Sequence, residues 1–448
     1  MKKILFCTAF SLMCLLPGQL LYAQSKIWTL EECVRYAIDN NIQIKQQTVQ
    51  TRVQKNSLDL AKLNLLPTIN GSATHDYSFG RALDQTSYEF YNQTIQSDYI
   101  SLGGRTNLFN GLQNLNTIRK SKYELLAGEQ DLQNIRDNVA LSVALGYLQI
   151  LLNKELVSAN ENQLNITLQQ IDKTKKLVNA GSVARGNLLQ IEAQAAQEEL
   201  SLITMKNQLE ISYLNLTQLL ELETPAGFEI VVPEFSIDSN SVITGNIDEI
   251  YNIARQSRPE IKSSEYKLTA SEYDLKIARG ARSPSLSLSH SFTTRYSFIE
   301  NQPGLPSFKD QLKNNKNYGL GFTLNIPILN GWQVNKNIAN SKLSVENSQY
   351  SLEGTEKQLY KNIQQAYTDA VAALKKYSAS LKAVSSAEES FRYTEQKFNV
   401  GMVTPVDYNA AKTQLLNAQS DLAQSKYEFI FKTKVLDFYK GIPLNLNE

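Results

Sequence analysis

Residues 284–298 have the sequence PSLSLSHSFTTRYSF, in which apolar and polar side chains alternate along the stretch. This period of two predicts a β-strand with one apolar face and one polar face. A second alternating stretch, residues 318–328, follows after a polar loop. The two stretches together predict a β-hairpin over residues 284–329.

The hairpin has a weaker counterpart half a chain earlier, over residues 67–109. Aligning Pro67 with Pro284 gives an offset of 217 residues, and beyond the hairpins the offset becomes 220. Ordered matches at a nearly constant offset indicate an internal duplication. We therefore predict two tandem repeats joined by a connector, with the bounds 24–232, 233–245 and 246–448.

Each repeat is predicted to contain a helix, a hairpin, a long helix without proline and a returning helix. The bounds are 28–66, 67–109, 112–178 and 187–222 in the first repeat, and 246–282, 284–329, 332–398 and 405–440 in the second. Each long helix has 67 residues, which is roughly 100 Å at the helical rise per residue. The returning helices carry an apolar residue at every seventh position, a spacing typical of coiled coils.

Residues 1–23 predict a secretory signal peptide, because Lys2 and Lys3 precede an apolar stretch and Ala23 provides a small residue for cleavage. Lipidation at Cys14 is the less favoured alternative, since the bulky Met13 precedes it. After the leader no run of 18 apolar residues occurs, so the sequence predicts no membrane-spanning helix. We expect an exported protein that can cross a membrane only by means of strands.

The composition argues against several classes of function. Lys and Arg total 45 against 44 Asp and Glu, whereas a nucleic-acid binder should show a strong basic excess. Three Cys and two His leave little material for metal sites or thiol chemistry. His75 and His290 both fall on the apolar sides of predicted strands. With no phosphate-binding glycine loop and no nucleophile motif in the sequence, we expect neither an enzyme nor a cofactor.

Four alternating strands cannot bury their apolar faces on a soluble rod of helices. One interpretation is a small sheet packed on a cap domain, and the other is a membrane barrel around a water-filled lumen. Because four strands are too few for such a barrel, three chains would have to contribute twelve. The fold class predicted in this way is mainly α with a shared β-barrel. The lipid-facing candidates are Leu286, Leu288, Phe292, Leu320, Phe322, Leu324, Ile326 and Ile328.

The doubled order of motifs resembles the outer membrane efflux protein family, the TolC-like channels. The strand-to-helix junctions Leu108-Phe109-Asn110-Gly111 and Ile328-Leu329-Asn330-Gly331 carry this resemblance, together with the turns at Gly181 and Gly401. It implies a homotrimer with a twelve-stranded barrel in the outer membrane of a Gram-negative bacterium and a helical tunnel in the periplasm. It also implies a periplasmic adaptor protein and an inner-membrane transporter as partners.

In this view the chain is the exit duct of a tripartite efflux or type I secretion system, and passes small molecules or proteins. The sequence does not distinguish these cargoes. An alternative of a different class is an exported coiled-coil scaffold or adhesin, which keeps the helices but needs no barrel.

Asp407 is the candidate for a periplasmic gate, because the resembling family has an acidic residue six positions after the glycine that corresponds to Gly401. Asn187 occupies the same position in the first repeat, and Ala410 stands where a companion acid would be expected. An alternative is that Thr404-Pro405-Val406-Asp407 forms a helix-capping box, and one residue could do both. The candidates for adaptor docking at the helical tips are Gly181, Val183, Gly401 and Val403.

Overall fold

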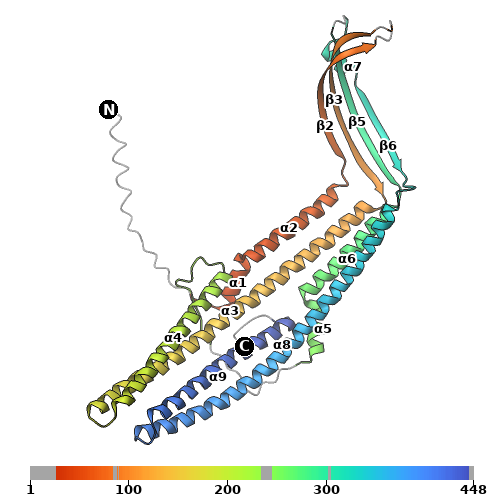
Figure 1. The fold of residues 1–448 in the computed structure, drawn as a ribbon. Coiled ribbons are helices and arrows are strands. Elements are labelled where there is room, and N and C mark those ends of the chain that lie inside the picture. Colours follow the sequence, from red (N-terminus) through yellow and green to blue (C-terminus); the bar gives the residue numbers. More distant parts are fainter. Residues whose placement is uncertain (1–26, 84–87, 89, 234–244, 301–303, 443–448) are drawn as a thin grey trace, which may run out of the picture.

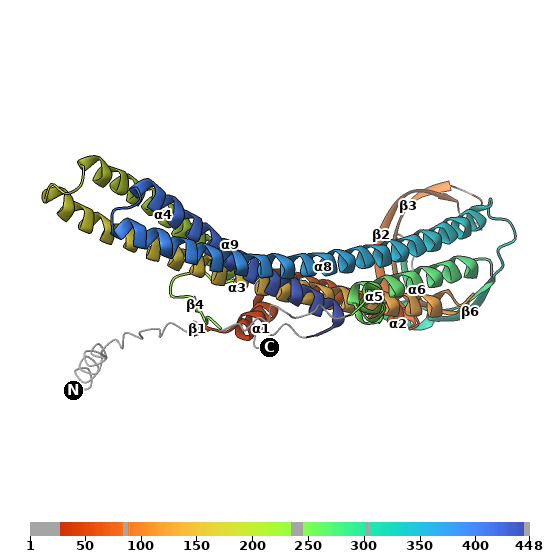
Figure 2. The ribbon, with the colours of Figure 1, turned by 90° about the horizontal axis from the view of Figure 1, so that it is seen from below.

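The computed structural model describes residues 27–83, 88, 90–233, 245–300 and 304–442. The predicted signal peptide and most of the predicted connector lie outside the described residues. The described part is a long bundle of helices with a four-stranded sheet at one end and two helical tips at the other (Figure 1). Seen from below, the helices form one elongated body that continues past the small β1–β4 sheet (Figure 2).

In both halves of the chain a pair of helices is followed by a β-hairpin, a long helix and a returning helix, whereas β1, β4 and α7 have no counterpart among the described residues of the other half. The first half contains β1 (Ile27–Trp28), α1 (Leu30–Asn40), α2 (Ile42–Leu63), β2 (Thr68–Leu83), β3 (Phe90–Asn110), α3 (Gln113–Asn179), α4 (Arg185–Leu219) and β4 (Glu229–Ile230). The second half contains α5 (Ile247–Ser257), α6 (Pro259–Gly280), β5 (Ser285–Ile299), α7 (Phe308–Asn314), β6 (Asn317–Asn325), α8 (Gln333–Asn399) and α9 (Pro405–Lys440).

The first helical segment of each repeat is broken in two, which the sequence analysis did not predict. In the first repeat the break falls at Asn41, whose side chain accepts a hydrogen bond from the Gln43 amide at 2.9 Å. In the second repeat it falls at Arg258, which precedes Pro259 and has an extended backbone conformation. A residue before proline disfavours the helical region, and proline is well suited to the first position of the next helix.

The two long helices, α3 and α8, each have 67 residues and begin one residue later than predicted. A hydrophobic core lies where α1, α3 and α4 meet, and Val143, Tyr147 and Leu216 are almost completely buried in it. Leu145 lies on a neighbouring face of α3 and is 40% exposed.

Among the described helices, α3 alone is long and apolar enough over one 18-residue window to cross a membrane by length and composition. Those two properties also describe a core helix of an elongated bundle. Since α3 packs against α1, α2, α4, α6 and α9, we assign its apolar stretch to the core.

The four long strands form an antiparallel sheet with the order β2-β3-β5-β6. Leu286 lies opposite Leu324 and Leu288 opposite Phe322, so these apolar side chains share one face of the sheet. That face is open: Leu320 is 79% exposed and Phe322 is 71% exposed. The alternation predicted for the second hairpin is therefore present, and its apolar face has no covering element within the described residues.

The second hairpin differs from the prediction in two places. The strand β6 ends at Asn325, so the lipid-facing candidates Ile326 and Ile328 lie outside it, although both are exposed. The physical reason is Pro327, which cannot donate a backbone hydrogen bond to a neighbouring strand. The predicted loop over residues 299–317 contains the short helix α7.

The sheet also depends on a glycine beneath a histidine ring. A Cβ atom added at Gly104 would lie 2.6 Å from Nε2 of His290 and 1.8 Å from the carbonyl oxygen of Thr68. At Gly80, near the other end of β2, nothing lies within 4 Å of an added Cβ. Gly104 is thus required by close packing of β2, β3 and β5, whereas Gly80 is not.

We predict that Gly104→Ala destabilises the protein by about 3 kcal/mol, the upper end for overpacking, because a backbone oxygen cannot move aside easily. Thermal unfolding of the purified protein in detergent, followed by circular dichroism, measures the change. Gly80→Ala is the matched control and should leave the melting temperature unchanged. Equal effects of the two substitutions would contradict this packing argument.

Candidate functional site

The two helical tips, at the end of the molecule opposite the sheet, are built from the same backbone turn. Gly181 and Gly401 adopt the left-handed conformation, with φ of +72° and +80°. The amide of the next residue, Ser182 or Met402, donates to a carbonyl five residues earlier, at 2.9 and 2.8 Å. This pattern closes a helix C-terminus and favours glycine, which explains the two predicted turns.

A cavity of about 770 Å³ lies between the two tips. Four of the residues predicted at the tips line it: Val183, Asn187, Gly401 and Val403. Across it, Nζ of Lys173 donates to Oδ1 of Asn399 at 2.7 Å and so connects the end of α3 to the end of α8. Gly181 is exposed and does not line this cavity.

Asp407 forms the capping box at the start of α9. Its carboxylate accepts hydrogen bonds from the Thr404 hydroxyl at 2.7 Å and the Thr404 amide at 3.2 Å, and its own amide donates to the Thr404 hydroxyl. These hydrogen bonds lower the pKa of Asp407, which is exposed and does not line the tip cavity. The first repeat has Ala184 at the capping position of α4, so Asn187 has no hydroxyl to complete such a box.

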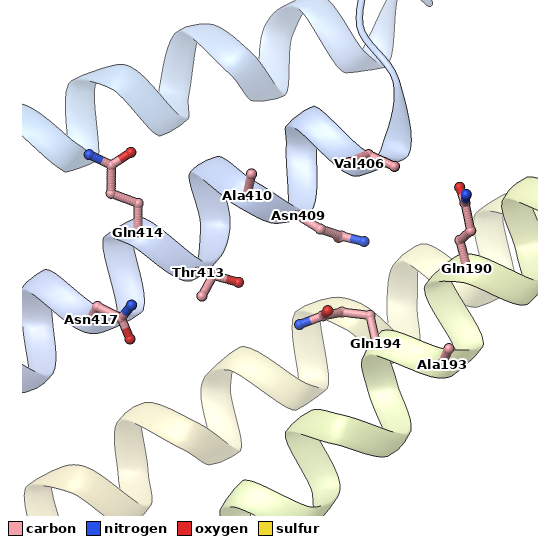
Figure 3. Close-up of a pocket in the computed structure, with 9 residues that line it drawn as sticks. All are labelled: Gln190, Ala193, Gln194, Val406, Asn409, Ala410, Thr413, Gln414 and Asn417. Atoms are coloured by element: carbon pink, nitrogen blue, oxygen red, sulfur yellow. The ribbon is translucent and has the colours of Figure 1, made fainter.

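A second groove, of about 720 Å³, runs between α4 and α9 above the tips (Figure 3). Its nine lining residues are all uncharged, and five of them carry carboxamides: Gln190, Gln194, Asn409, Gln414 and Asn417. Ala410, where a second acidic residue would be expected, also lies in this groove. The side chains of α4 and α9 therefore face each other across a polar but neutral surface.

A buried charge pair lies beside this groove and joins three helices. Nζ of Lys412 on α9 is 3.6 Å from Oε1 of Glu198 on α4, and both side chains are less than 10% exposed. Lys412 also donates to the carbonyl oxygen of Gln163 on α3 at 2.8 Å and to the hydroxyl of Thr167. Burial lowers the pKa of Lys412, and the Glu198 carboxylate opposes that shift. The ammonium group thus has two hydrogen-bond acceptors and a carboxylate beside it.

Sequence analysis did not identify Lys412 or Glu198, although one signal was present. Glu198 lies three residues after Ala195, an apolar position of the seven-residue pattern, where a coiled coil normally buries another apolar residue. A charged residue at such a position indicates a buried partner. The identity of that partner could not be read from the sequence, because Lys412 is more than 200 residues away.

The Outer membrane efflux protein family model matches residues 34–221 and 250–430, one segment in each repeat. The two segments cover most of the chain, so this protein belongs to the outer membrane efflux protein family. The resemblance noted in the sequence is confirmed, and so is the TolC-like fold class. The chain is an outer-membrane protein of a Gram-negative bacterium, with its helical part in the periplasm.

Individual relatives are distant in sequence. The chain is 22% identical over 338 residues to the outer membrane efflux protein BepC of Brucella suis, covering 73% of this chain and 67% of BepC. It is 23% identical over 312 residues to TolC of Escherichia coli, covering 68% of this chain and 62% of TolC. The matches span 61–67% of the length of the curated relatives.

The fold is shared more completely than the sequence. The crystal structure of the outer membrane protein VceC from Vibrio cholerae superposes with a TM-score of 0.77, at 17% identity. The superposition covers 93% of this chain and 97% of VceC. The elements described above are thus those of a known channel architecture, whereas their side chains have largely changed.

We predict that Lys412→Met destabilises the protein by about 3–5 kcal/mol, because it leaves Glu198 as an uncompensated buried charge. The double variant Lys412→Met/Glu198→Gln should regain most of this loss. Lys426→Met is the control, since its partner Glu155 is 3.4 Å away and partly exposed, and it should cost at most about 1 kcal/mol. Thermal unfolding of the parent protein, the two single variants and the double variant measures these differences. A double variant no more stable than Lys412→Met would contradict the proposed coupling.

Proposed function

We propose that three copies of this chain form a channel through the outer membrane and serve as the exit duct of a tripartite efflux system. The observation that carries this proposal is the four-stranded sheet, which is open at β2 and at β6 and exposes an apolar face. In lipid, strands must be closed into a barrel, because unpaired backbone groups there have no hydrogen-bonding partner.

Joining β6 of one copy to β2 of the next closes the sheet into twelve strands. The second face of the sheet would then line the lumen. On β5 and β6 this face carries Ser287, Ser289 and Ser291 opposite Thr323, Gly321 and Gly319. Small hydroxyl and glycine residues leave room for water and attract no single class of solute, so the duct would select by size rather than by specific binding. An exported scaffold or adhesin would have no use for the exposed apolar face.

The periplasmic tips are the proposed docking surface for an adaptor protein that connects the duct to an inner-membrane transporter. Val400, Met402 and Val406 at the second tip are all more than half exposed. Beside them, Val183, Gly401 and Val403 line the cavity between the tips, and Gly181 shapes the first turn. An exposed apolar cluster at the end of a polar helical rod suits a protein partner. The same duct would also serve type I secretion, with proteins as the cargo.

The trimeric channel is tested by mass and conductance. Purified protein in detergent should have the mass of three chains, and it should form ion-conducting pores in a lipid bilayer. A water-soluble monomer that forms no pores would overturn the proposal.

We predict that Phe322→Lys impairs assembly, because a lysine at the bilayer midplane costs roughly 2–4 kcal/mol. Thr323→Lys, one residue along the same strand and on the opposite face, should assemble normally. The yield of trimer in purified outer membranes measures both effects. If both variants assemble equally poorly, the two faces of the sheet have been assigned wrongly.

We further propose that Asp407 forms an acidic ring where three copies converge at the periplasmic entrance, in addition to capping α9. The hydrogen bonds from Thr404 lower the pKa of Asp407, so its carboxylate stays ionised to a lower pH than that of an ordinary aspartate. Asp407→Asn should then reduce cation selectivity and block by trivalent cations in single-channel recordings. Thr404→Ala removes the cap but keeps the charge, so it should preserve both properties. The opposite pattern, with Thr404→Ala causing the loss, would leave Asp407 as a helix cap only.

A further inference from the structure

One edge of the sheet changes its hydrogen-bonding partner halfway along. The strand β5 has 15 residues but β6 has only 9, and their pairing ends where Thr293 lies opposite Asn317. Beyond Thr293, no strand of the described residues lies beside the edge of β5 that faces β6. The short helix α7 lies at this position, at the outer end of the sheet (Figure 1).

Side chains from α7 and the residue after it take over the hydrogen bonds of the missing strand. Oε1 of Gln311 accepts from the Ser297 amide at 2.9 Å, and Nε2 of Gln311 donates to the Ser297 carbonyl oxygen at 2.9 Å. Nδ2 of Asn315 donates to the carbonyl oxygen of Arg295, also at 2.9 Å. Alternate residues of an antiparallel strand point their backbone groups to the same edge, so these contacts continue the β6 side.

Gln311 therefore acts as a substitute for a strand residue. A carboxamide presents one acceptor and one donor side by side, as a residue of a neighbouring strand does. Gln311 is only 8% exposed, and the carbonyl oxygen of Pro306 accepts from its Nε2 at 3.0 Å. The Thr294 hydroxyl adds a further bond, to the carbonyl oxygen of Leu312 at 2.8 Å. These contacts fix α7 directly above β6 on the same edge.

The opposite edge of the sheet is formed by β2, which is longer than β6. The strand β2 has 16 residues, and in the part of the chain that the structure describes no strand pairs with its outer edge. If β6 of one copy joins β2 of the next, its 9 residues can pair with at most 9 of those 16 and leave at least 7 unpaired. An edge left open in this way is exposed to wrong pairing and needs a cover.

Exposed aromatic side chains on one face of the sheet indicate which element covers this edge of β2 and which residues it contacts. Phe308 of α7 packs against Tyr296, with 4.9 Å between ring centroids, yet remains 49% exposed. Tyr296 lies across Asp98 from His75, so it shares a face with Tyr77 and Phe79 of β2. Phe79 is 78% exposed and Tyr77 is 55% exposed.

We propose that α7 completes the boundary between neighbouring copies by covering the outer part of the next copy's β2, with Phe308 against Tyr77 and Phe79 of that copy. This inference rests on the proposed assembly of three copies through β6 and β2. It adds that the boundary is made of strand pairing near the helices and of helix-on-strand packing near the outer mouth.

Cysteine cross-linking tests this contact. Phe308→Cys is combined in one chain with Tyr77→Cys or Phe79→Cys, and a short thiol-specific cross-linker is added to purified protein in detergent. We expect covalently linked trimers with at least one of these combinations. Phe308→Cys with Ile69→Cys is the matched control, since Ile69 lies on the same face of β2 and is 66% exposed but is near the helices. The native Cys33 is fully buried and should not react.

The mass of the uncross-linked protein, measured in parallel, separates the two proposals. A protein of trimeric mass that yields no linked trimer with Tyr77→Cys or Phe79→Cys would overturn the role of α7 alone. Linking with Ile69→Cys as efficient as with Phe79→Cys would overturn it as well. A monomeric mass would overturn the assembly and this inference together.

A second variant tests the anchor. Gln311→Leu keeps the size of the side chain but removes both hydrogen bonds to Ser297, which should displace α7 and lower the yield of linked trimer about tenfold. The trimeric mass should be unchanged, because the pairing of β6 is left intact. An unchanged yield would show that Gln311 does not hold α7 in place.

Discussion

Among the described residues no strand pairs with the outer edges of β2 and β6, and the fold has to satisfy the backbone groups on these edges. Water could satisfy these edges, but water would then also cover the exposed apolar face formed by residues such as Leu320 and Phe322. Lipid could cover that face, but lipid cannot satisfy the edges. The backbone edges are satisfied and the apolar face is removed from water together only if the edges join other strands within a membrane. For the proposed channel, insertion into the membrane and assembly of the copies are therefore one requirement rather than two.

The helices are attached to this sheet through a turn that explains the most specific motif in the sequence. At each strand-to-helix junction two consecutive residues adopt the left-handed conformation: Gly111 with Leu112, and Gly331 with Trp332. A Cβ atom at Gly111 would lie 2.2 Å from the carbonyl oxygen of Gly280, so the packing of α3 beside α6 also requires glycine there. The paired Asn-Gly motif marks the place where the chain leaves the sheet and enters a 67-residue helix.

Sequence patterns predicted what depends on local periodicity. The long helices, the glycine turns and the alternating face of β5 all follow from spacing, and the family assignment followed from their doubled order. Features set by contacts between distant residues were missed. The helix α7 replaces part of a predicted loop because Gln311 satisfies Ser297, and the pairing of Lys412 with Glu198 joins two repeats. No local pattern contains those pairs, since each depends on the folded arrangement.

The two repeats differ at the positions that hold the buried charge pair. The position equivalent to Lys412 in the first repeat is Glu192, and the position equivalent to Glu198 in the second is Ala418, so the buried pair can form only once per chain. It lies within the chain, where α9 meets α3 and α4. In the proposed trimer, the boundary between copies would not contain this pair. Within the chain, moving α9 away from α3 and α4 would leave two buried charges without their partners, so the pair opposes relative movement of these helices.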